Sequence, residues 1–406
     1  MIYTSPIESI TWLAVEEFLS QGIKENSYVD YKENWPDKLA RTIAAMANTL
    51  GGVILLGVEE NDDASPKVPA VGVSLERGMS ERVTNIVVSS ITPPVFPAVQ
   101  VCANTDGSRA IVVIRVPQSH QAPHAVMGDR RIYVRTNDRN KPEELATMRE
   151  LEWLREHRAK ALELRNRTYQ IAVDRSDLFL GYTTRPYPGS RTVVPESKPY
   201  LLACAAPYYP RDTLVTPPTL QTLAREIRVR DYYGTDQEFP IGGARGHLLQ
   251  DGVYLFEEMK RETGERAYYT EFSVFGQFFY RQTLTYKRSG DRFLRSSEIF
   301  ARLDQFMRVA KGYLERLGLQ GNVWFHVLMG SLGGSTLGQW EPNERVETTT
   351  ACHDEAVAFE TTLTMTDWDS QSAEAIGGAA QKIAWAYDWN MPADLVASYL
   401  AKNRRA

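Results

Sequence analysis

Cysteine is scarce in this sequence: the three cysteines, Cys102, Cys204 and Cys352, lie a hundred residues or more apart. This spacing excludes a CxxC metal pair and gives no disulfide framework, so we expect buried thiols. Long apolar runs are also missing, since none approaches the roughly 18 residues of a membrane-spanning helix. The opening segment MIYTSPIESITW lacks the basic start and apolar core of a signal peptide. We therefore expect a cytoplasmic protein without a membrane segment.

A net positive charge is absent as well, because the formal charge is −5 at pH 7. This argues against a protein covered in phosphate contacts, although local basic patches can still bind nucleic acid. Residues 1–63 carry eleven Asp or Glu and four Lys or Arg, whereas residues 115–141 carry six Lys or Arg and two Asp. A metal-dependent nuclease needs such a division, with acids for the ion and bases for the phosphate backbone. Solvated faces of a mildly acidic protein explain it equally well.

The length of 406 residues exceeds that of one ordinary domain, and 43% hydrophobic with 24% charged residues is typical of a soluble globular protein. Proline and tyrosine crowd the sequence from about residue 168. We therefore expect two domains. The first, residues 1–166, should be α/β to α+β with a mixed sheet and helices, and the second, residues 167–406, a separate α+β domain that senses, docks or dimerises.

Acidic residues of the first domain lie beside predicted strands. Alternation in SYVDYK places Asp30 and Lys32 on one face of a strand. The apolar run VILLGV predicts a buried central strand that delivers Glu59 and Glu60 at its carboxyl end. With Glu25, these acids bracket a glycine-tightened turn, an arrangement typical of Mg²⁺ or Mn²⁺ sites that face a phosphodiester.

The remaining sequence alternates predicted helices with predicted strands. In the first domain the helices should span 8–20, 36–50, 77–91 and 143–166, and further strands 95–103, 109–116 and 131–136. In the second domain the helices should span 297–317 and 371–387, and strand structure 200–206, 252–259, 267–286 and 322–330. Asn48 and Thr49 should cap the end of the second helix, beside Gly51 and Gly52.

This order of motifs resembles the Schlafen AlbA_2 domain family, an AlbA-like group once described as a divergent ATP-binding domain. The resemblance rests on Glu25, Asp30-Tyr31-Lys32, AMANTLGG, VILLGVEE and RIYVRT, and it covers about residues 20–140, roughly a third of the chain. The pattern ANT-x-GG before an apolar strand and Gly-Val is fairly specific. It implies a prokaryotic Schlafen-like protein with an AlbA-like first domain.

In Schlafen ribonucleases, three carboxylates at these places bind a divalent ion and cleave structured RNA such as tRNA. The resemblance gives this catalytic and metal-binding role to Glu25, Asp30 and Glu60, with Mg²⁺ or Mn²⁺ as the ion. Lys32 would neutralise the phosphate. Asp30 stands where the family usually has glutamate, and Glu60 where it usually has aspartate. A carboxylate one methylene shorter or longer moves its oxygens by about a bond length, which matters for Mg²⁺ held at about 2.0–2.1 Å.

Basic residues in and on either side of RIYVRT are the candidates for binding the nucleic-acid backbone: Arg130, Arg131, Arg135, Arg139 and Lys141. The implied function is a metal-dependent endoribonuclease that cleaves tRNA in stress response or phage defence. The alternative is a non-catalytic regulator that binds RNA or DNA through the same strand, and a third is a protein-interaction module. The acids would then be surface charges around a turn. Schlafen cores pair two such lobes and this sequence has one, so we expect a homodimer.

Other sites are disfavoured by spacing. TLGGVILLG has neither the glycine spacing nor the lysine of a P-loop, so we expect no ATP binding. Pro123 breaks any helix that could aim His120 and His124 at one metal, and we expect both in a loop. No Cys and His cluster matches the zinc site of Schlafen cores. Cys352-His353-Asp354 is an accidental run unless distant residues complete it.

Overall fold

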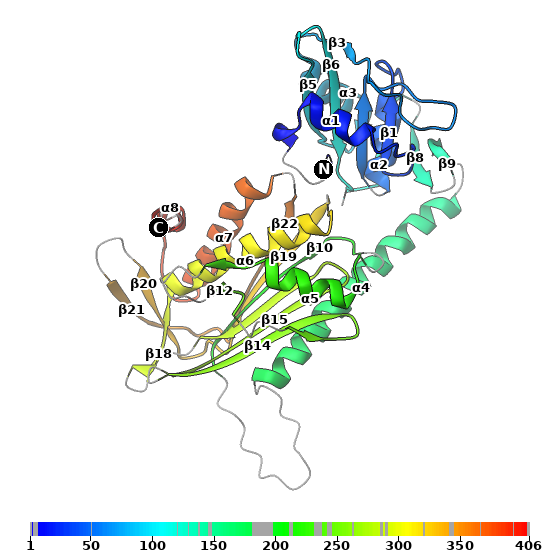
Figure 1. The fold of residues 1–406 in the computed structure, drawn as a ribbon. Helices are drawn as coiled ribbons and strands as arrows, with labels where there is room; N and C mark the ends of the chain where they lie inside the picture. Colours follow the sequence, from blue (N-terminus) through cyan, green and yellow to red (C-terminus); the bar gives the residue numbers. More distant parts are fainter. Residues whose placement is uncertain are drawn as a thin grey trace. The chain divides into compact units, whose positions relative to one another are not determined.

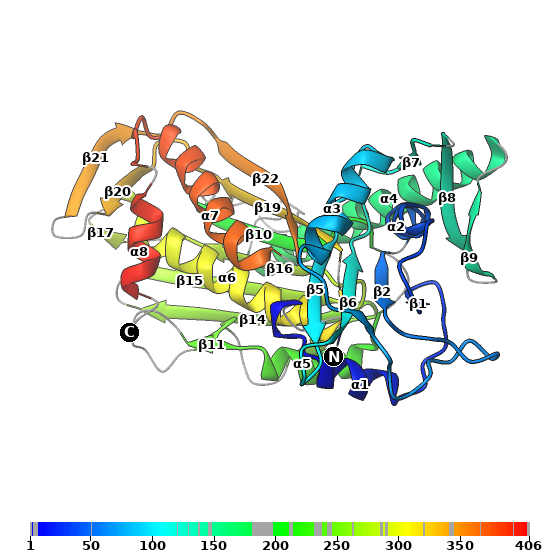
Figure 2. The same cartoon turned by 90° about the horizontal axis from the view of Figure 1, so that it is seen from above.

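The computed structural model describes residues 2, 7–49, 51–119, 121–128, 130–136, 139–144, 148–180, 198–210, 214–230, 238–241, 246–261, 264–284, 287–288, 291–319, 321–340, 345–365, 367–392 and 394–403. The chain divides into an N-terminal unit, residues 1–159 with 318–322, and a C-terminal unit, residues 160–317 with 323–406. Both are mixed α and β structures (Figure 1 and Figure 2), which confirms the predicted fold class. Among the helices that the structure describes, none is both long and apolar enough to cross a membrane.

A five-stranded mixed sheet forms the centre of the N-terminal unit. Its strands are β1 (Val29–Lys32), β2 (Gly52–Leu56), β3 (Val73–Ser74), β5 (Ala98–Ala103) and β6 (Arg109–Val116). Strand β2 pairs in parallel with β1 and antiparallel with β6, and β6 also pairs with β3 and β5. All five residues of β2 are buried, so the prediction of a buried central strand is confirmed.

Helices cover both faces of this sheet: η1 (Ile7–Ser9) and α1 (Trp12–Leu19) on one, α2 (Leu39–Asn48) and α3 (Met79–Ser90) on the other. The β1 residues Val29 and Tyr31 pack in the core beside α1. Because side chains alternate along a strand, Asp30 and Lys32 face the side covered by α2 and α3. The sheet edge at β1 therefore carries charged groups on the α2 side.

Two adjacent glycines connect α2 to β2. Gly51 has φ +71, in the left-handed region, and a Cβ there would lie 2.7 Å from the Val116 carbonyl oxygen. A Cβ on Gly52 would lie 2.5 Å from the carbonyl oxygen of Tyr28. Neither position accepts a side chain, so the two glycines of ANTLGG are required by close backbone packing.

A second, four-stranded sheet in this unit consists of β4 (Ile91–Thr92), β7 (Ala125–Val126), β8 (Arg131–Thr136) and β9 (Arg139–Glu144). The prediction of a helix from residue 143 was wrong at its start, because Glu143 and Glu144 pair with Val134 and Tyr133 across β8 and β9. The long charged helix is α4 (Met148–Leu180), and it extends past the predicted end at residue 166.

The C-terminal unit is organised around a seven-stranded sheet in the order β13-β14-β15-β16-β10-β19-β22. These strands are β10 (Tyr200–Pro207), β13 (His247–Leu248), β14 (Gly252–Arg261), β15 (Gly264–Ser273), β16 (Phe278–Thr283), β19 (Asn322–Gly330) and β22 (Ala356–Thr364). The strand structure predicted over 267–286 is two antiparallel strands, β15 and β16, joined by a turn at Gly276 with φ +84.

Helices pack on both faces of the seven-stranded sheet. Tyr169 and Ala172 of α4 join one core with Tyr269 and Phe279, while Tyr313 of α6 stacks edge-on against Phe272 on the other face. The helices of this unit, besides α4, are α5 (Pro217–Glu226), α6 (Ser296–Arg316), α7 (Trp368–Trp385) and α8 (Leu395–Asn403). Its shorter strands are β11 (Val229–Arg230), β12 (Glu238–Phe239), β17 (Lys287–Arg288), β18 (Asp291–Arg295), β20 (Thr336–Trp340) and β21 (Arg345–Ala351).

Candidate functional site in the N-terminal unit

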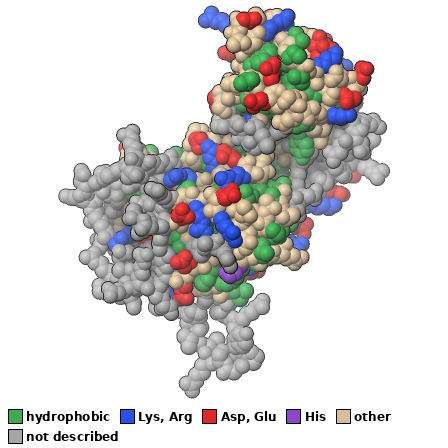
Figure 3. Space-filling model, viewed as in Figure 1, with side chains coloured by type: hydrophobic (Ala, Val, Ile, Leu, Met, Phe, Trp, Pro, Cys, Tyr) green, Lys and Arg blue, Asp and Glu red, His purple; other side chains and the backbone are tan. Residues whose placement is uncertain are grey.

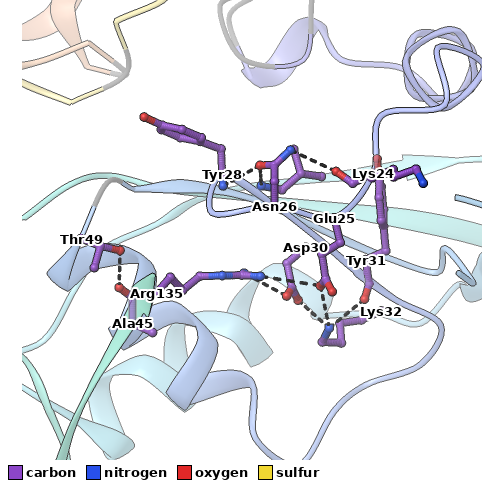
Figure 4. Close-up of polar contacts among 11 residues, drawn as sticks. Lys24, Glu25, Asn26, Tyr28, Asp30, Tyr31, Lys32, Ala45, Thr49 and Arg135 are labelled. Atoms are coloured by element: carbon purple, nitrogen blue, oxygen red, sulfur yellow. Dashed lines mark hydrogen bonds and ion pairs between the residues drawn. The ribbon is translucent and has the colours of Figure 1, made fainter. Parts of the chain in front are cut away.

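Two acids and two bases meet at the edge of the central sheet, and we call Glu25, Asp30, Lys32 and Arg135 the carboxylate cluster (Figure 4). Asp30 is 1% exposed, and its two oxygens lie 2.7 Å from Lys32 Nζ and 2.9 Å from Arg135 Nη1. Glu25 Oε1 lies 3.5 Å from the same Nζ and 3.7 Å from Arg135 Nη2. Both acids therefore share both cations.

Local turns hold Glu25 and Lys32 in place. The Asn26 side-chain oxygen accepts hydrogen bonds from the backbone N–H groups of Tyr28 and Val29, at 2.8 and 3.1 Å, which fixes the chain between Glu25 and β1. The carbonyl oxygen of Lys32 accepts from the N–H groups of Gly57 and Val58, at 2.7 and 3.1 Å. The end of β1 is thereby joined to the segment that leads to Glu60.

The electrostatics of the cluster are asymmetric. The pKa of Glu25 is raised to about 8, mainly by burial and then by the hydrogen bond with Asp30 and the charge of Asp30. Burial alone would raise the pKa of Asp30, but the hydrogen bond from Glu25 and the charges of Lys32 and Arg135 lower it. Burial would lower the pKa of Lys32, but Asp30 and Glu25 raise it. Near neutral pH, Glu25 carries the proton and Asp30 the charge.

Of the pair Glu59 and Glu60, the structure associates Glu60 with the cluster. After the larger effects of burial and Asp30, the charge of Glu60 also raises the pKa of Glu25. Glu59 instead forms an ion pair with Lys67 across the turn that follows β2. The backbone N–H of Glu25 donates to the Ala64 carbonyl at 2.8 Å, so this turn folds back beside Glu25. The charge of the third acid expected from the sequence therefore acts on Glu25.

The oxygen donors of the cluster have the chemistry that Mg²⁺ and Mn²⁺ prefer. Their arrangement fits an ion less well. Across the described residues, no group of three His, Cys, Asp or Glu side chains lies close enough together to hold a metal ion. The ammonium group of Lys32 stands between Glu25 and Asp30, where a cation held by both would have to lie. A metal would need Lys32 to move away.

The predicted backbone-binding arginines divide into two groups. Arg130 and Arg131 are exposed at the start of β8, whereas Arg135 is 4% exposed and contacts the cluster acids. Arg135 lies two residues after Tyr133, on the same face of the strand, and Tyr133 packs in the core beside α2. This two-residue spacing is the sequence signal that could have predicted the burial of Arg135. The side chains of Arg139 and Lys141 lie outside the described residues. On the face shown in Figure 3, charges of both signs are interspersed over the N-terminal unit.

Asn48 has a structural role that the sequence analysis missed. Its side-chain nitrogen donates to the carbonyl oxygens of His124 and Tyr133, at 2.9 and 2.8 Å, and its oxygen accepts from the His124 N–H at 2.7 Å. Asn48 thus ties α2 to β8, which carries Arg135, and the prediction that it caps the helix was wrong. Thr49 does satisfy the helix end, since its hydroxyl donates to the Ala45 carbonyl at 2.7 Å. His120 lies outside the described residues.

Comparison with known proteins places this site in a family. Residues 25–144 match the model of the family described as Schlafen, AlbA_2. Among solved structures, the chain is similar to the N-terminal domain of a RecG-related protein from Nitrosomonas europaea, with 18% identity, a TM-score of 0.25 and coverage of 29% of this chain and 81% of that one. No curated protein matches the sequence. The match contains Glu25, Asp30, Lys32, Glu60 and Arg135, so the carboxylate cluster lies within the part of the chain that is similar to the Schlafen, AlbA_2 family.

Proposed function

We propose that the chain binds nucleic acid through its N-terminal unit, without cleaving it in the arrangement seen here. The Schlafen AlbA_2 domain gives this unit a nucleic-acid-related role. Binding without cleavage is supported by the ion pairs of Asp30. Its carboxylate is buried, and its charge is neutralised by both Lys32 and Arg135. A carboxylate engaged by two cations is a poor ligand for a further one.

Lys32 and the exposed arginines of β8 would contact the phosphates. The side chain of Lys32 is 29% exposed, so its ammonium group can meet solvent and the cluster acids together. With Glu25 protonated, the charges of Asp30 and Glu60 balance those of Lys32 and Arg135, so a phosphate is not repelled. Arg130 and Arg131 add exposed positive charge. RNA is the favoured partner, and DNA is an outcome of the same binding experiment.

Metal-dependent cleavage of RNA is the second candidate, favoured by the raised pKa of Glu25. A proton shared between two close carboxylates marks a place where a cation relieves their repulsion. Glu25, Asp30 and Glu60 would hold Mg²⁺ or Mn²⁺, which would polarise the scissile phosphate and activate water. Lys32 would then swing from Asp30 to the phosphate. Cleavage of tRNA in stress response or phage defence belongs to this candidate.

One experiment separates the two candidates. The purified chain is incubated with total tRNA in Mg²⁺, in Mn²⁺ and in chelator, and both binding and RNA integrity are measured. We expect equal binding in all three and intact RNA. Cleavage that requires the metal, that is lost in Asp30→Asn and Glu60→Gln, and that survives in Glu59→Gln would instead establish the nuclease. Glu59 is the matched control because it pairs with Lys67.

We also propose a homodimer, since the chain contains one AlbA_2 match where Schlafen cores pair two lobes. Light scattering of the full chain tests this independently of nucleic acid. A strict monomer at all concentrations, with undiminished nucleic-acid binding, would contradict it.

A further inference from the structure

A cation and an aromatic ring are stacked beside the carboxylate cluster. The guanidinium carbon of Arg82, on α3, lies 4.2 Å from the centroid of the Trp35 ring. Trp35 is half-buried and packs against the core between the sheet and α2 and α3. Arg82 is exposed. The indole therefore supports a flat cation whose outer face is open to solvent.

Arg82 has no competing partner in the part of the chain that the structure describes. No carboxylate forms an ion pair with it there, and its recorded contact is the Trp35 ring. Stacking holds a planar guanidinium in one orientation and so lowers the entropy lost when it binds a second group. An exposed arginine prepared in this way is suited to a phosphate, or to a base that stacks on its outer face.

The stack lies within reach of the cluster. Trp35 follows Lys32 by three residues, which span at most about 11 Å of extended chain. Asp30 and Lys32 face the α2 and α3 side of the sheet, and Trp35 packs on that same side. One nucleic-acid strand can therefore contact Lys32 and Arg82 through neighbouring nucleotides.

An open hollow of about 540 Å³ continues from Arg82 along α3. Asn85 and Ser89 line it with polar groups, and Ile86 and Val88 line it with apolar ones. A base offers the matching combination, with an apolar face and hydrogen-bonding edges. The side-chain amide of Asn85 has no hydrogen-bond partner among the described residues, so it remains available to a base edge.

We propose that Arg82, held flat on Trp35, binds an unpaired nucleotide of a single-stranded nucleic acid, with the base lying toward Asn85. This inference rests on the proposed nucleic-acid function and deepens it by naming the strand state of the partner. A duplex keeps its bases stacked inside, so it cannot use the outer face of Arg82 in this way.

The test is fluorescence anisotropy of the full chain with labelled oligouridine, and with a duplex of the same length, in chelator. Arg82→Gln should weaken oligouridine binding about ten-fold, and Arg82→Lys nearly as much, because an ammonium group keeps the charge but not the plane. Arg77→Gln is the matched control, since Arg77 is exposed on the same segment, and it should cost less than about two-fold. Duplex binding should respond equally to Arg82→Gln and Arg77→Gln.

Each other result overturns the inference. Equal losses for Arg82→Gln and Arg77→Gln with oligouridine would remove the site and leave the proposed function standing. Wild-type oligouridine binding by Arg82→Lys would mean that Arg82 contributes only its charge and that its planar guanidinium is not needed. A wild-type chain that binds neither probe would overturn the proposed function together with the site. Thermal melts confirm that each variant is folded, and Arg82→Met, which keeps an apolar stem over Trp35, replaces Arg82→Gln if that variant does not fold.

Discussion

The ammonium group of Lys32 lies 2.7 Å from Asp30 and 3.5 Å from Glu25, so this one cation contacts both acids of the cluster. These groups reach the same point from different segments, because Glu25 precedes β1 and Lys32 ends it. The ammonium thus occupies the place that a divalent ion would take. Removing it tests whether the two acids can bind a divalent ion instead.

Replacing Lys32 with Met should lower the free energy of unfolding by about 2 kcal/mol, because buried Asp30 loses an ion pair and keeps one cation, Arg135. If the carboxylates can accept a divalent ion, millimolar Mg²⁺ should raise the melting temperature of Lys32→Met more than that of the wild type. NaCl at equal ionic strength and the surface variant Lys24→Met are the controls. An identical Mg²⁺ response in both proteins would argue against a latent metal site.

Replacing Arg135 with Gln should cost about 3 kcal/mol of stability, because it leaves Asp30 buried with one fewer cation. Arg130→Gln, at the exposed residue just before the same strand, should change stability by no more than about 0.5 kcal/mol. Urea denaturation measures both. If Arg135→Gln were as stable as the wild type while nucleic-acid binding fell, Arg135 would be a backbone-binding residue after all.

Glu25 should make the protein less stable as pH rises between about 4.5 and 8. Its pKa is raised from 4.5 to about 8, so in this window the folded state holds a proton that the unfolded state releases. The stabilisation is complete below the unfolded value and declines by at most about 1.4 kcal/mol per pH unit as pH approaches 8. Glu25→Gln should flatten this slope in denaturation curves measured at several pH values.

Asp30 affects the pH dependence of stability in the opposite direction, and below the pH range in which Glu25 acts. Its pKa is lowered, so its stabilisation is present above the ordinary value and is lost as pH falls toward the folded one. A slope between pH 5 and 8 that persists in Glu25→Gln would therefore point to a group other than these two acids.

Asn48→Ala should destabilise the N-terminal unit by about 3 kcal/mol, because it removes three buried hydrogen bonds, two to the carbonyl oxygens of His124 and Tyr133 and one from the His124 N–H. Asn34→Ala, in the exposed loop after β1, should stay within about 0.5 kcal/mol of the wild type. Since Asn48 holds α2 to the strand that carries Arg135, the variant should also show faster hydrogen exchange along β8. Unchanged exchange with lowered stability would confine its role to α2.

The local part of the site could be predicted from the sequence. Strand alternation placed Asp30 beside Lys32, and the apolar run of β2 placed Glu60 at the end of the neighbouring strand. The pairing of Arg135 with Asp30 could not be predicted, because the two lie 105 residues apart and meet only when β8 packs on α2. The motif spacing contains no information about that packing.

The same limit explains the errors in the fold. The charged residues after 143 are compatible with a helix, and pairing with β8 is what draws Glu143 and Glu144 into β9. The second half of α4 carries residues such as Tyr169 and Ala172, whose partners are in a sheet formed by later sequence. Local propensity was overridden in both cases by contacts between distant segments.

The close approach of Gly52 to the Tyr28 carbonyl separates two kinds of information in this domain. The glycines of ANTLGG and the Asn48 side chain determine how the backbone packs. Glu25, Asp30 and Glu60 determine the chemistry of the site. A chain could exchange every acid of the cluster and still present the motif intact. The motif therefore indicates the fold of the domain. Whether a protein with this motif cleaves nucleic acid, binds it or has a structural role depends on the side chains around Lys32.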